Sequence, residues 1–167
     1  MKTRNLAWMG MMVAVAFVLS YIEAMLPISF GIPGIKLGLS NIVVMLCLYE
    51  GSLKQTFGIA IVRIILVGLT FGNMSMMLYS LAGGLFSLLV MTLLKKSGRF
   101  SVYGVSLMGG VMHNVGQILV AVVILQQKGL LLYYLPFLLV AGCVSGIGIG
   151  IIAAVLIKRL HGIMREE

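Results

Sequence analysis

Apolar segments long enough to cross a membrane follow one another along almost the whole chain, separated by short groups of Pro, Gly and charged residues. A helix needs about 20 mainly apolar residues to span the hydrocarbon core of a bilayer. Hydrophobic residues make up 61% of the 167 residues, charged residues only 10%, and the mean hydropathy is +1.16. A soluble domain of this length has no interior for so much apolar surface. The sequence therefore predicts an all-α, polytopic membrane protein.

Breaks at Pro, Gly and charge clusters divide the chain into six predicted transmembrane helices, which together form a single membrane domain over residues 1–167. The second helix is predicted to be short, because the Pro- and Gly-rich residues 27–34 precede it and Gly51 ends it. The first apolar segment is too long for a signal peptide, and no Ala-x-Ala-like cleavage site follows, so we expect it to remain. We expect a six-helix bundle with spans at about residues 6–26, 37–50, 54–71, 75–94, 102–125 and 133–157.

Lysine and arginine residues predict the orientation, since positive residues stay on the cytoplasmic side. With the N-terminus inside, the cytoplasmic set is Lys2, Arg4, Lys54, Lys95, Lys96, Arg99, Lys158, Arg159 and Arg165. Lys36 and Lys128 fall outside, and Arg63 lies within a span. We therefore expect a multi-pass protein of a bacterial cytoplasmic membrane with both termini in the cytoplasm. The net charge of +8 follows this topology and does not indicate nucleic-acid binding, because no basic helix with interleaved aromatic residues occurs.

Acidic residues are too few for metal-dependent chemistry. The chain contains no Asp, and its acids are Glu23, Glu50, Glu166 and Glu167. Diphosphate chemistry that depends on magnesium needs clustered carboxylates, which these cannot supply. The chain also has no phosphate-binding loop for ATP, and the glycines of residues 146–150 lie inside a span. We expect no enzymatic activity, no catalytic residue, no metal and no cofactor.

Small residues recur every four positions in two spans. In the last span they are Gly142, Gly146, Gly150 and Ala154. Such a smooth stripe lets another helix approach closely, and here we favour packing within the protein over a partner. A weaker row in the first span contains Gly10 and Ala14, for which internal packing and a partner protein are equally good interpretations.

Arg63 is the most informative residue, because it lies near the middle of an apolar span. An arginine at that depth costs roughly 2.5 to 3.5 kcal/mol on insertion scales, so it should face a partner, a cavity or a bound anion. One interpretation is a structural salt bridge with Glu23, the intramembrane acid placed nearest to it. The other, which we favour, is contact with an anionic substrate.

Depth along the helices, at about 1.5 Å per residue, groups the remaining polar residues with Arg63. The predicted polar layer opens to the outside and contains Glu23, Asn41, Arg63, His113, Asn114 and Gln117. The loop residues Lys36, Asn73 and Ser75 are expected above it. For Asn41, Asn114 and Gln117, interhelical hydrogen bonding is an equally good interpretation, at about 0.6 kcal/mol each, and a lone histidine such as His113 is often only a core residue.

The chemistry of a ligand is predicted from the same layer and its surroundings. Arg63, His113 and Lys36 favour an anionic or strongly hydrogen-bonding ligand. An apolar and aromatic wall is expected from Met74, Met76, Met77, Tyr79, Tyr133 and Tyr134, although at least one of the last two fits an interfacial aromatic residue better. An amphipathic cargo fits both sets: an isoprenoid or quinone precursor, or a flavin-like vitamin.

Four sequence strings carry a family resemblance. They are Ile-Lys-Leu-Gly-Leu-Ser-Asn at 35–41, Arg-Ile-Ile-Leu-Val-Gly at 63–68, Ser-Leu-Ala-Gly-Gly at 80–84, and Gly-Val-Ser-Leu-Met-Gly-Gly-Val-Met-His-Asn-Val-Gly-Gln at 104–117. Over about residues 5–157 the chain resembles the Gx transporter family, also labelled heptaprenyl diphosphate synthase component I. That family is similar to the substrate-binding S components of energy-coupling factor (ECF) transporters. The synthase label conflicts with the absence of Asp.

The resemblance implies a six-helix subunit that captures a small molecule from outside and has no ATPase of its own. A shared membrane scaffold and two cytoplasmic ATPases would drive a toppling movement through the surrounding membrane lipids. Such proteins contact the scaffold through Ala-x-x-x-Ala on the first helix, and Gly10-x-x-x-Ala14 is the nearest match here. The alternative is a non-transporting membrane subunit of an electron-transfer or isoprenoid/quinone-synthesis assembly. A channel is disfavoured, because the sequence shows no continuous polar path.

Overall fold

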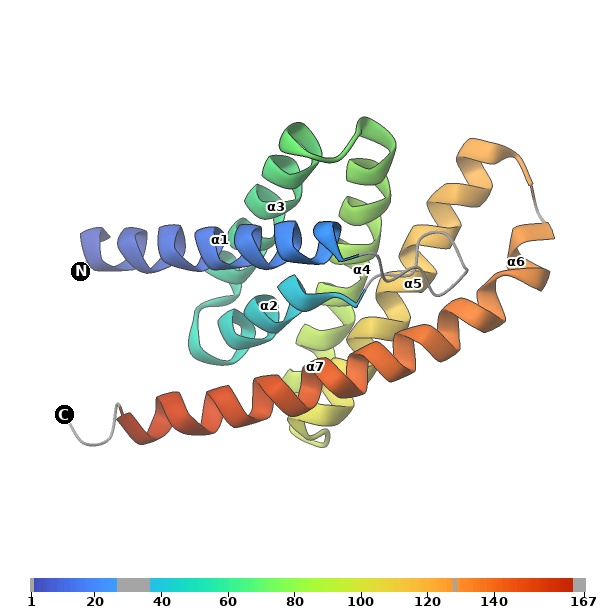
Figure 1. Cartoon of the computed structure of the whole chain (residues 1–167). Coiled ribbons are helices and arrows are strands. Elements are labelled where there is room, and N and C mark those ends of the chain that lie inside the picture. The colour runs from blue at the N-terminus through green and yellow to red at the C-terminus, as the bar shows by residue number, and fades with distance from the viewer. Residues whose placement is uncertain (1, 27–36, 128, 164–167) are drawn as a thin grey trace.

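A computed structural model describes residues 2–26, 37–127 and 129–163 of the chain. Throughout these ranges the regular structure is helical and contains no strand, which confirms the all-α prediction. The helices are α1 (Lys2–Met25), α2 (Leu39–Glu50), α3 (Leu53–Thr70), α4 (Met74–Ser97), α5 (Val102–Leu125), α6 (Gly129–Tyr133) and α7 (Leu135–Ile163) (Figure 1).

Five of these helices, α1, α3, α4, α5 and α7, are long and apolar enough to cross a membrane. The second predicted span is short as expected, since α2 has only 12 residues. At about 1.5 Å per residue it extends roughly 18 Å, well short of the ~30 Å hydrocarbon core. The sequence did not predict α6. It also predicted a first helix that starts later than α1 does and a last helix that ends earlier than α7 does. The described residues therefore contain five helices of spanning length and one shorter apolar helix, α2.

Helix ends follow from local capping residues. Ser52 and Gln55 form a reciprocal pair at the start of α3, in which each backbone N–H donates to the other side chain at 2.9 and 3.3 Å. The Ser101 hydroxyl accepts from the N–H of Gly104 at the start of α5. These caps satisfy amide groups that the helices themselves leave unpaired.

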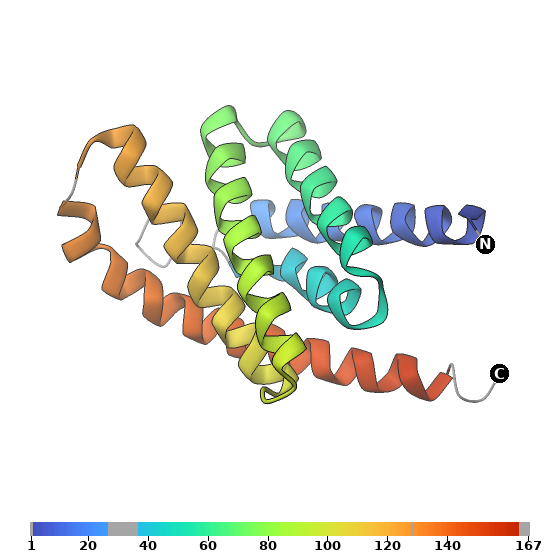
Figure 2. The ribbon, with the colours of Figure 1, turned by 180° about the vertical axis from the view of Figure 1, so that it is seen from behind.

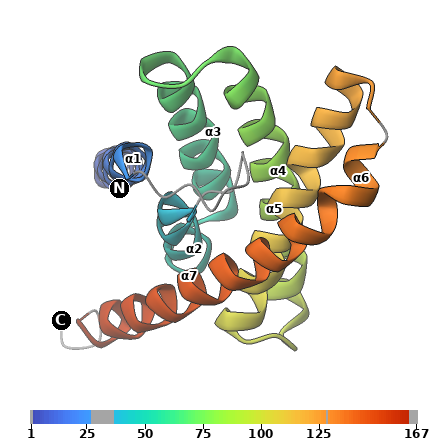
Figure 3. The ribbon, with the colours of Figure 1, turned by 45° about the vertical axis from the view of Figure 1, so that its right-hand side comes forward.

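The molecule consists of two groups of helices. In the C-terminal half, α4 to α7, helix α5 makes the most extensive contacts in the fold, with α7 and with α4. The N-terminal half, α1 to α3, contacts this group mainly through α2 on α7 and α3 on α4. Figures 1 and 2 show the start of α1 and the end of α7 at the same end of the molecule. In Figure 3 α1 is seen almost end-on while α3 stands upright, so α1 crosses α3 rather than lying parallel to it.

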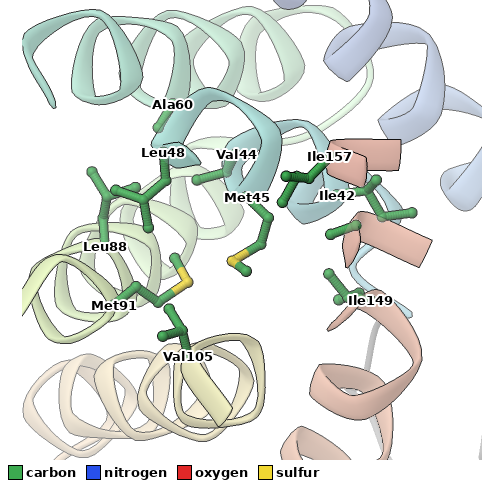
Figure 4. Close-up of a cluster of buried hydrophobic side chains, with 11 residues drawn as sticks. Ile42, Val44, Met45, Leu48, Ala60, Leu88, Met91, Val105, Ile149 and Ile157 are labelled. Atoms are coloured by element: carbon green, nitrogen blue, oxygen red, sulfur yellow. The ribbon is translucent and has the colours of Figure 1, made fainter. Parts of the chain in front are cut away.

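Helix α2 lies at the centre of the core. Seven of its 12 residues are buried, including Met45 and Val43, at 1% and 2% exposure. Figure 4 shows its apolar side chains meeting Leu88 and Met91 of α4, Val105 of α5 and Ile149 of α7. A helix that is apolar all round is stable when protein surrounds it. This burial explains how so short a helix is held in the fold.

The glycine stripe of α7 packs against α5, as predicted. A Cβ atom at Gly142 would lie 2.9 Å from the carbonyl oxygen of Gly110, and one at Gly146 would lie 2.8 Å from the Cα of Leu107. The Ser106 hydroxyl donates to the carbonyl of Gly146 at 2.8 Å. Close backbone approach of this kind requires glycine, so the stripe serves internal packing.

The small-residue row of α1 has a different environment. Gly10 and Ala14 are exposed, and no heavy atom of the described residues lies within 4 Å of a Cβ built at Gly10. Internal packing is therefore wrong for this row in the part of the chain that is described. Its use by a partner stays a prediction.

Candidate ligand-binding cavity

A cavity of about 390 Å³ lies between the two halves of the molecule. Its walls come from α1, the beginning of α2, α3, α4, α5 and α7. Ligand pockets in proteins usually have volumes of about 300 to 1,000 Å³, so this cavity suits a small molecule.

All six residues of the predicted polar layer line this cavity. They are Glu23, Asn41, Arg63, His113, Asn114 and Gln117. They come from four helices, α1, α2, α3 and α5. The fold therefore brings together the residues that the sequence placed at similar depth.

Three other predicted site residues do not join them. Asn73 is outside the cavity, because its side chain accepts from the N–H of Met76 at 2.8 Å and caps α4. Tyr79 is also absent from the lining, since it is rotated by about 100° around α4 from Ser80, which does line the cavity. Lys36 lies outside the described residues. Of the predicted apolar wall, Met76 and Met77 line the cavity, whereas Met74 and the tyrosines do not.

Arg63 is buried within this site, with only 8% of its surface exposed. One terminal nitrogen of the guanidinium, Nη1, donates to the hydroxyl of Ser40 at the start of α2. The Nε atom is buried and has no hydrogen-bond partner among the described residues. A buried donor of this kind costs about 1–3 kcal/mol when it stays unsatisfied. Arg63 therefore lines the cavity and has one donor that no described residue uses.

Glu23 does not form the salt bridge with Arg63 that one interpretation of the sequence required. Its carboxylate instead accepts from the backbone N–H of Gly38 at 2.6 Å and of Leu39 at 3.0 Å. These amides precede and begin α2, where the helix dipole favours negative charge. Gly38 adopts a left-handed conformation there, with φ of 76°, which glycine tolerates without strain. Glu23 thus fixes the beginning of α2, and its oxygens already have partners.

The polar residues of α5 have mixed roles. Asn114 donates from Nδ2 to the carbonyl of Leu138 at 2.7 Å, so the interhelical interpretation is confirmed for this residue, although it also lines the cavity. Gln117 and His113 lie beside Gly83 of α4, where a Cβ would be 2.9 Å from Gln117 Cγ. Close packing of α4 and α5 therefore positions both side chains at the cavity.

Sequence reasoning missed the serines of the site: Ser20, Ser40, Ser80 and Ser145. A serine in a membrane helix often hydrogen-bonds its own helix, as Ser20 does to Ala16 at 2.9 Å, and so attracts little attention. For Ser40 the available signal was its position directly before Asn41.

The other part of the cavity is apolar. Along α3 the lining residues Ile64, Val67 and Phe71 follow Arg63 at helical spacing, and Met76 and Met77 face them from α4. The ring of Phe71 packs against Phe17 and Tyr21 of α1, with centroids 5.5 and 5.6 Å away. The cavity is therefore amphipathic, with a guanidinium and an aromatic side chain separated along one helix.

We expect Glu23→Gln to weaken the beginning of α2. The amide nitrogen of glutamine cannot accept a hydrogen bond, so one of the two N–H groups loses its acceptor, and the negative charge near the helix start is removed. The expected loss of stability is about 1–3 kcal/mol, with faster hydrogen exchange at Gly38 and Leu39. Glu50→Gln, the same substitution at the other end of α2, should leave exchange at both amides unchanged. Unchanged exchange in Glu23→Gln would contradict the capping role.

Comparison with known proteins identifies the family. Residues 12–156 match the family model described as heptaprenyl diphosphate synthase component I, and this range includes every residue that lines the cavity. No curated protein and no solved structure matches the chain. Because the match covers most of the sequence, the chain belongs to the heptaprenyl diphosphate synthase component I family, the Gx transporter family, of membrane proteins.

Proposed function

We propose that this protein is a substrate-binding membrane subunit of the S-component type, which captures a small amphipathic molecule for uptake. The observation that carries the proposal is the buried guanidinium of Arg63, which lines a cavity of ligand size and has an unpartnered Nε donor. A bound anion would satisfy this donor and balance a charge that is costly at membrane depth. In this proposal the cargo is an isoprenoid or quinone precursor, or a flavin-like vitamin.

Binding without catalysis fits the residues of the site. Among the described residues that line the cavity, the one carboxylate is that of Glu23, and it is already engaged by two backbone amides. The described residues also contain no group of three or more His, Cys, Asp or Glu side chains placed to hold a metal ion. We therefore interpret the family's synthase name as describing an associated component.

Energy for uptake would come from partners, since the sequence has no phosphate-binding loop for ATP. The proposed partners are an ECF-type membrane scaffold and two cytoplasmic ATPases. With both termini in the cytoplasm of a bacterial cell, the cavity would receive cargo from outside. The start of α1 and the end of α7 lie at the same end of the molecule, which supports placing both on one side of the membrane (Figure 2).

A second candidate follows from the family description, which names a component of a larger unit. The protein would then be a non-transporting subunit of an electron-transfer or isoprenoid/quinone-synthesis assembly. In that case the cavity would hold a resident molecule and not a transported one.

Two measurements on the purified protein separate these candidates. Native mass spectrometry should detect a retained small molecule bound to the chain, and co-purification under mild detergent should recover a membrane scaffold with its ATPases. Recovery of prenyl synthases or flavoproteins without ATPases would favour the second candidate. A protein that retains no small molecule and binds none from a cell extract would contradict both.

The exposed row on α1 gives a test of the proposed scaffold contact. We expect Gly10→Leu combined with Ala14→Leu to abolish co-purification of the scaffold while leaving the thermal stability within about 1 kcal/mol, because Gly10 has open space around it. Gly148→Leu on α7 is the matched control, since a Cβ there also meets nothing within 4 Å. If both variants lose the partner equally, the contact is not made by α1.

A further inference from the structure

We propose that the ligand of this cavity carries a single negative charge on a carboxylate, which binds the Nε edge of Arg63, and an apolar body that extends along α3 toward Phe71. This inference rests on the proposed binding function and adds the chemical class of the ligand. It excludes the phosphate and diphosphate head groups that the family's name would suggest.

The charge of the cavity wall is the first argument. Among the described residues that line the cavity, Arg63 and Glu23 carry opposite formal charges, and the Glu23 carboxylate is already held by two backbone amides at the start of α2. The guanidinium is therefore left to pair with one further negative charge, which a bound carboxylate supplies. A phosphate monoester carries about −1.5 to −2 at this pH, and a diphosphate carries more. Such a group would leave uncompensated negative charge in a membrane-embedded site, which is costly.

The geometry of the guanidinium is the second argument. Arginine presents its N–H groups in a planar fork that matches the two oxygens of a carboxylate. The Ser40 hydroxyl takes Nη1, while Nε has no hydrogen-bond partner in the described part of the chain. The edge that carries Nε is therefore the one left for a ligand. Because Ser40 is itself buried, at 4% exposure, the fork is held in place before any ligand arrives.

The apolar stripe of α3 is the third argument. Arg63 and Phe71 are eight residues apart, which corresponds to about 12 Å along a helix. Between them Val67 lines the cavity on the same face, and Met77 lies opposite, in contact range of a Cβ built at Gly68. An anionic group at Arg63 thus directs the rest of the ligand past apolar and aromatic side chains. Methionine and phenylalanine adapt well to a flat or flexible hydrocarbon.

A set of three probes with one apolar body tests the inference. We would measure binding of 2-naphthoate, 2-naphthamide and 2-naphthyl phosphate to the purified full-length protein in nanodiscs at pH 7.5, by isothermal titration calorimetry. We expect naphthoate to bind with the highest affinity, with a Kd at least about tenfold lower than that of either the neutral amide or the phosphate. In Arg63→Gln this preference for the carboxylate over the amide should disappear.

Two further variants assign the effect to one side chain. Arg63→Lys keeps the charge but not the fork, so part of the carboxylate preference should remain. Arg99→Gln makes the same change as Arg63→Gln at an exposed arginine outside the cavity and should bind as the unmodified protein does. Loss of the preference in Lys36→Gln but not in Arg63→Gln would overturn the assignment to Arg63.

The outcomes distinguish this inference from the proposed function. Equal or tighter binding of the phosphate or the amide by the unmodified protein would overturn the carboxylate inference and leave a binding subunit intact. No binding of any of the three probes would count against both. Because these results come from the unmodified protein, they do not depend on whether the Arg63 variants fold.

Discussion

Replacing Arg63 with methionine is expected to make the ligand-free protein more stable and to remove its response to ligand. A buried arginine at membrane depth costs about 2.5–3.5 kcal/mol, and Ser40 would lose one hydrogen bond, at about 0.5–1.5 kcal/mol. We therefore expect a net gain of about 1–3 kcal/mol in the empty state. Affinity for the native ligand should fall at least about 100-fold, since a buried charge pair loses one partner. Thermal unfolding with and without the retained ligand measures both effects.

Arg99→Met is the matched control for this variant. It removes an exposed arginine that does not line the cavity, so neither the stability nor the response to ligand should change appreciably. A ligand-free Arg63→Met protein that fails to assemble would contradict the binding role. Arg63 would then be required for the fold itself.

The largest loss of stability is expected for Gly110→Val in α5. Its Cβ would meet the carbonyl oxygen of Gly142 at less than a normal contact distance and would lie 3.2 Å from the Cα of Gly146. Both are backbone atoms, so α7 must move away as a whole. We expect a loss of about 3 kcal/mol or more, although valine is a better helix former than glycine. The displacement would also strain the hydrogen bond from Asn114 to Leu138. The fall in melting temperature in detergent measures the effect.

Gly148→Val provides the control, because it introduces the same side chain on α7 where no heavy atom lies within 4 Å. This variant should unfold at or slightly above the temperature of the unmodified protein. Equal melting temperatures for Gly110→Val and Gly148→Val would show that α5 and α7 do not approach as closely as described.

The helices of spanning length were predictable because apolar length and capping residues are local properties. The range 102–125 matches α5 at both ends, since Ser101 caps one end and the polar Gln126 follows the other. Helix α6 was not predictable, because its five residues are shorter than any hydropathy window and lie directly before α7. The central position of α2 in the core could not be predicted from the sequence either. A helix that is apolar on all sides gives no periodicity to show what surrounds it.

The membership of the cavity was predictable, whereas the partners of its residues were not. Depth follows from the constant rise of a helix, and this placed Glu23, Arg63 and Gln117 in one layer. That Glu23 binds the amides of Gly38 and Leu39 depends on how the chain returns between α1 and α2, which no local pattern encodes. The role of Asn73 as the N-cap of α4 could have been predicted, because asparagine directly before an apolar helix is a common cap.

The unequal contacts between the helices have a mechanical consequence. Interlocked glycines make α5 and α7 stiff with respect to each other, and α4 is joined to them almost as firmly. Helices α1, α2 and α3 have less extensive contacts, both with one another and, at the junction between the two halves, with this frame. Packed helices respond to a load by sliding or turning as rigid bodies along such a junction. The cavity lies along this junction, so a change in how α1 and α3 pack against the other helices would change the shape of the cavity.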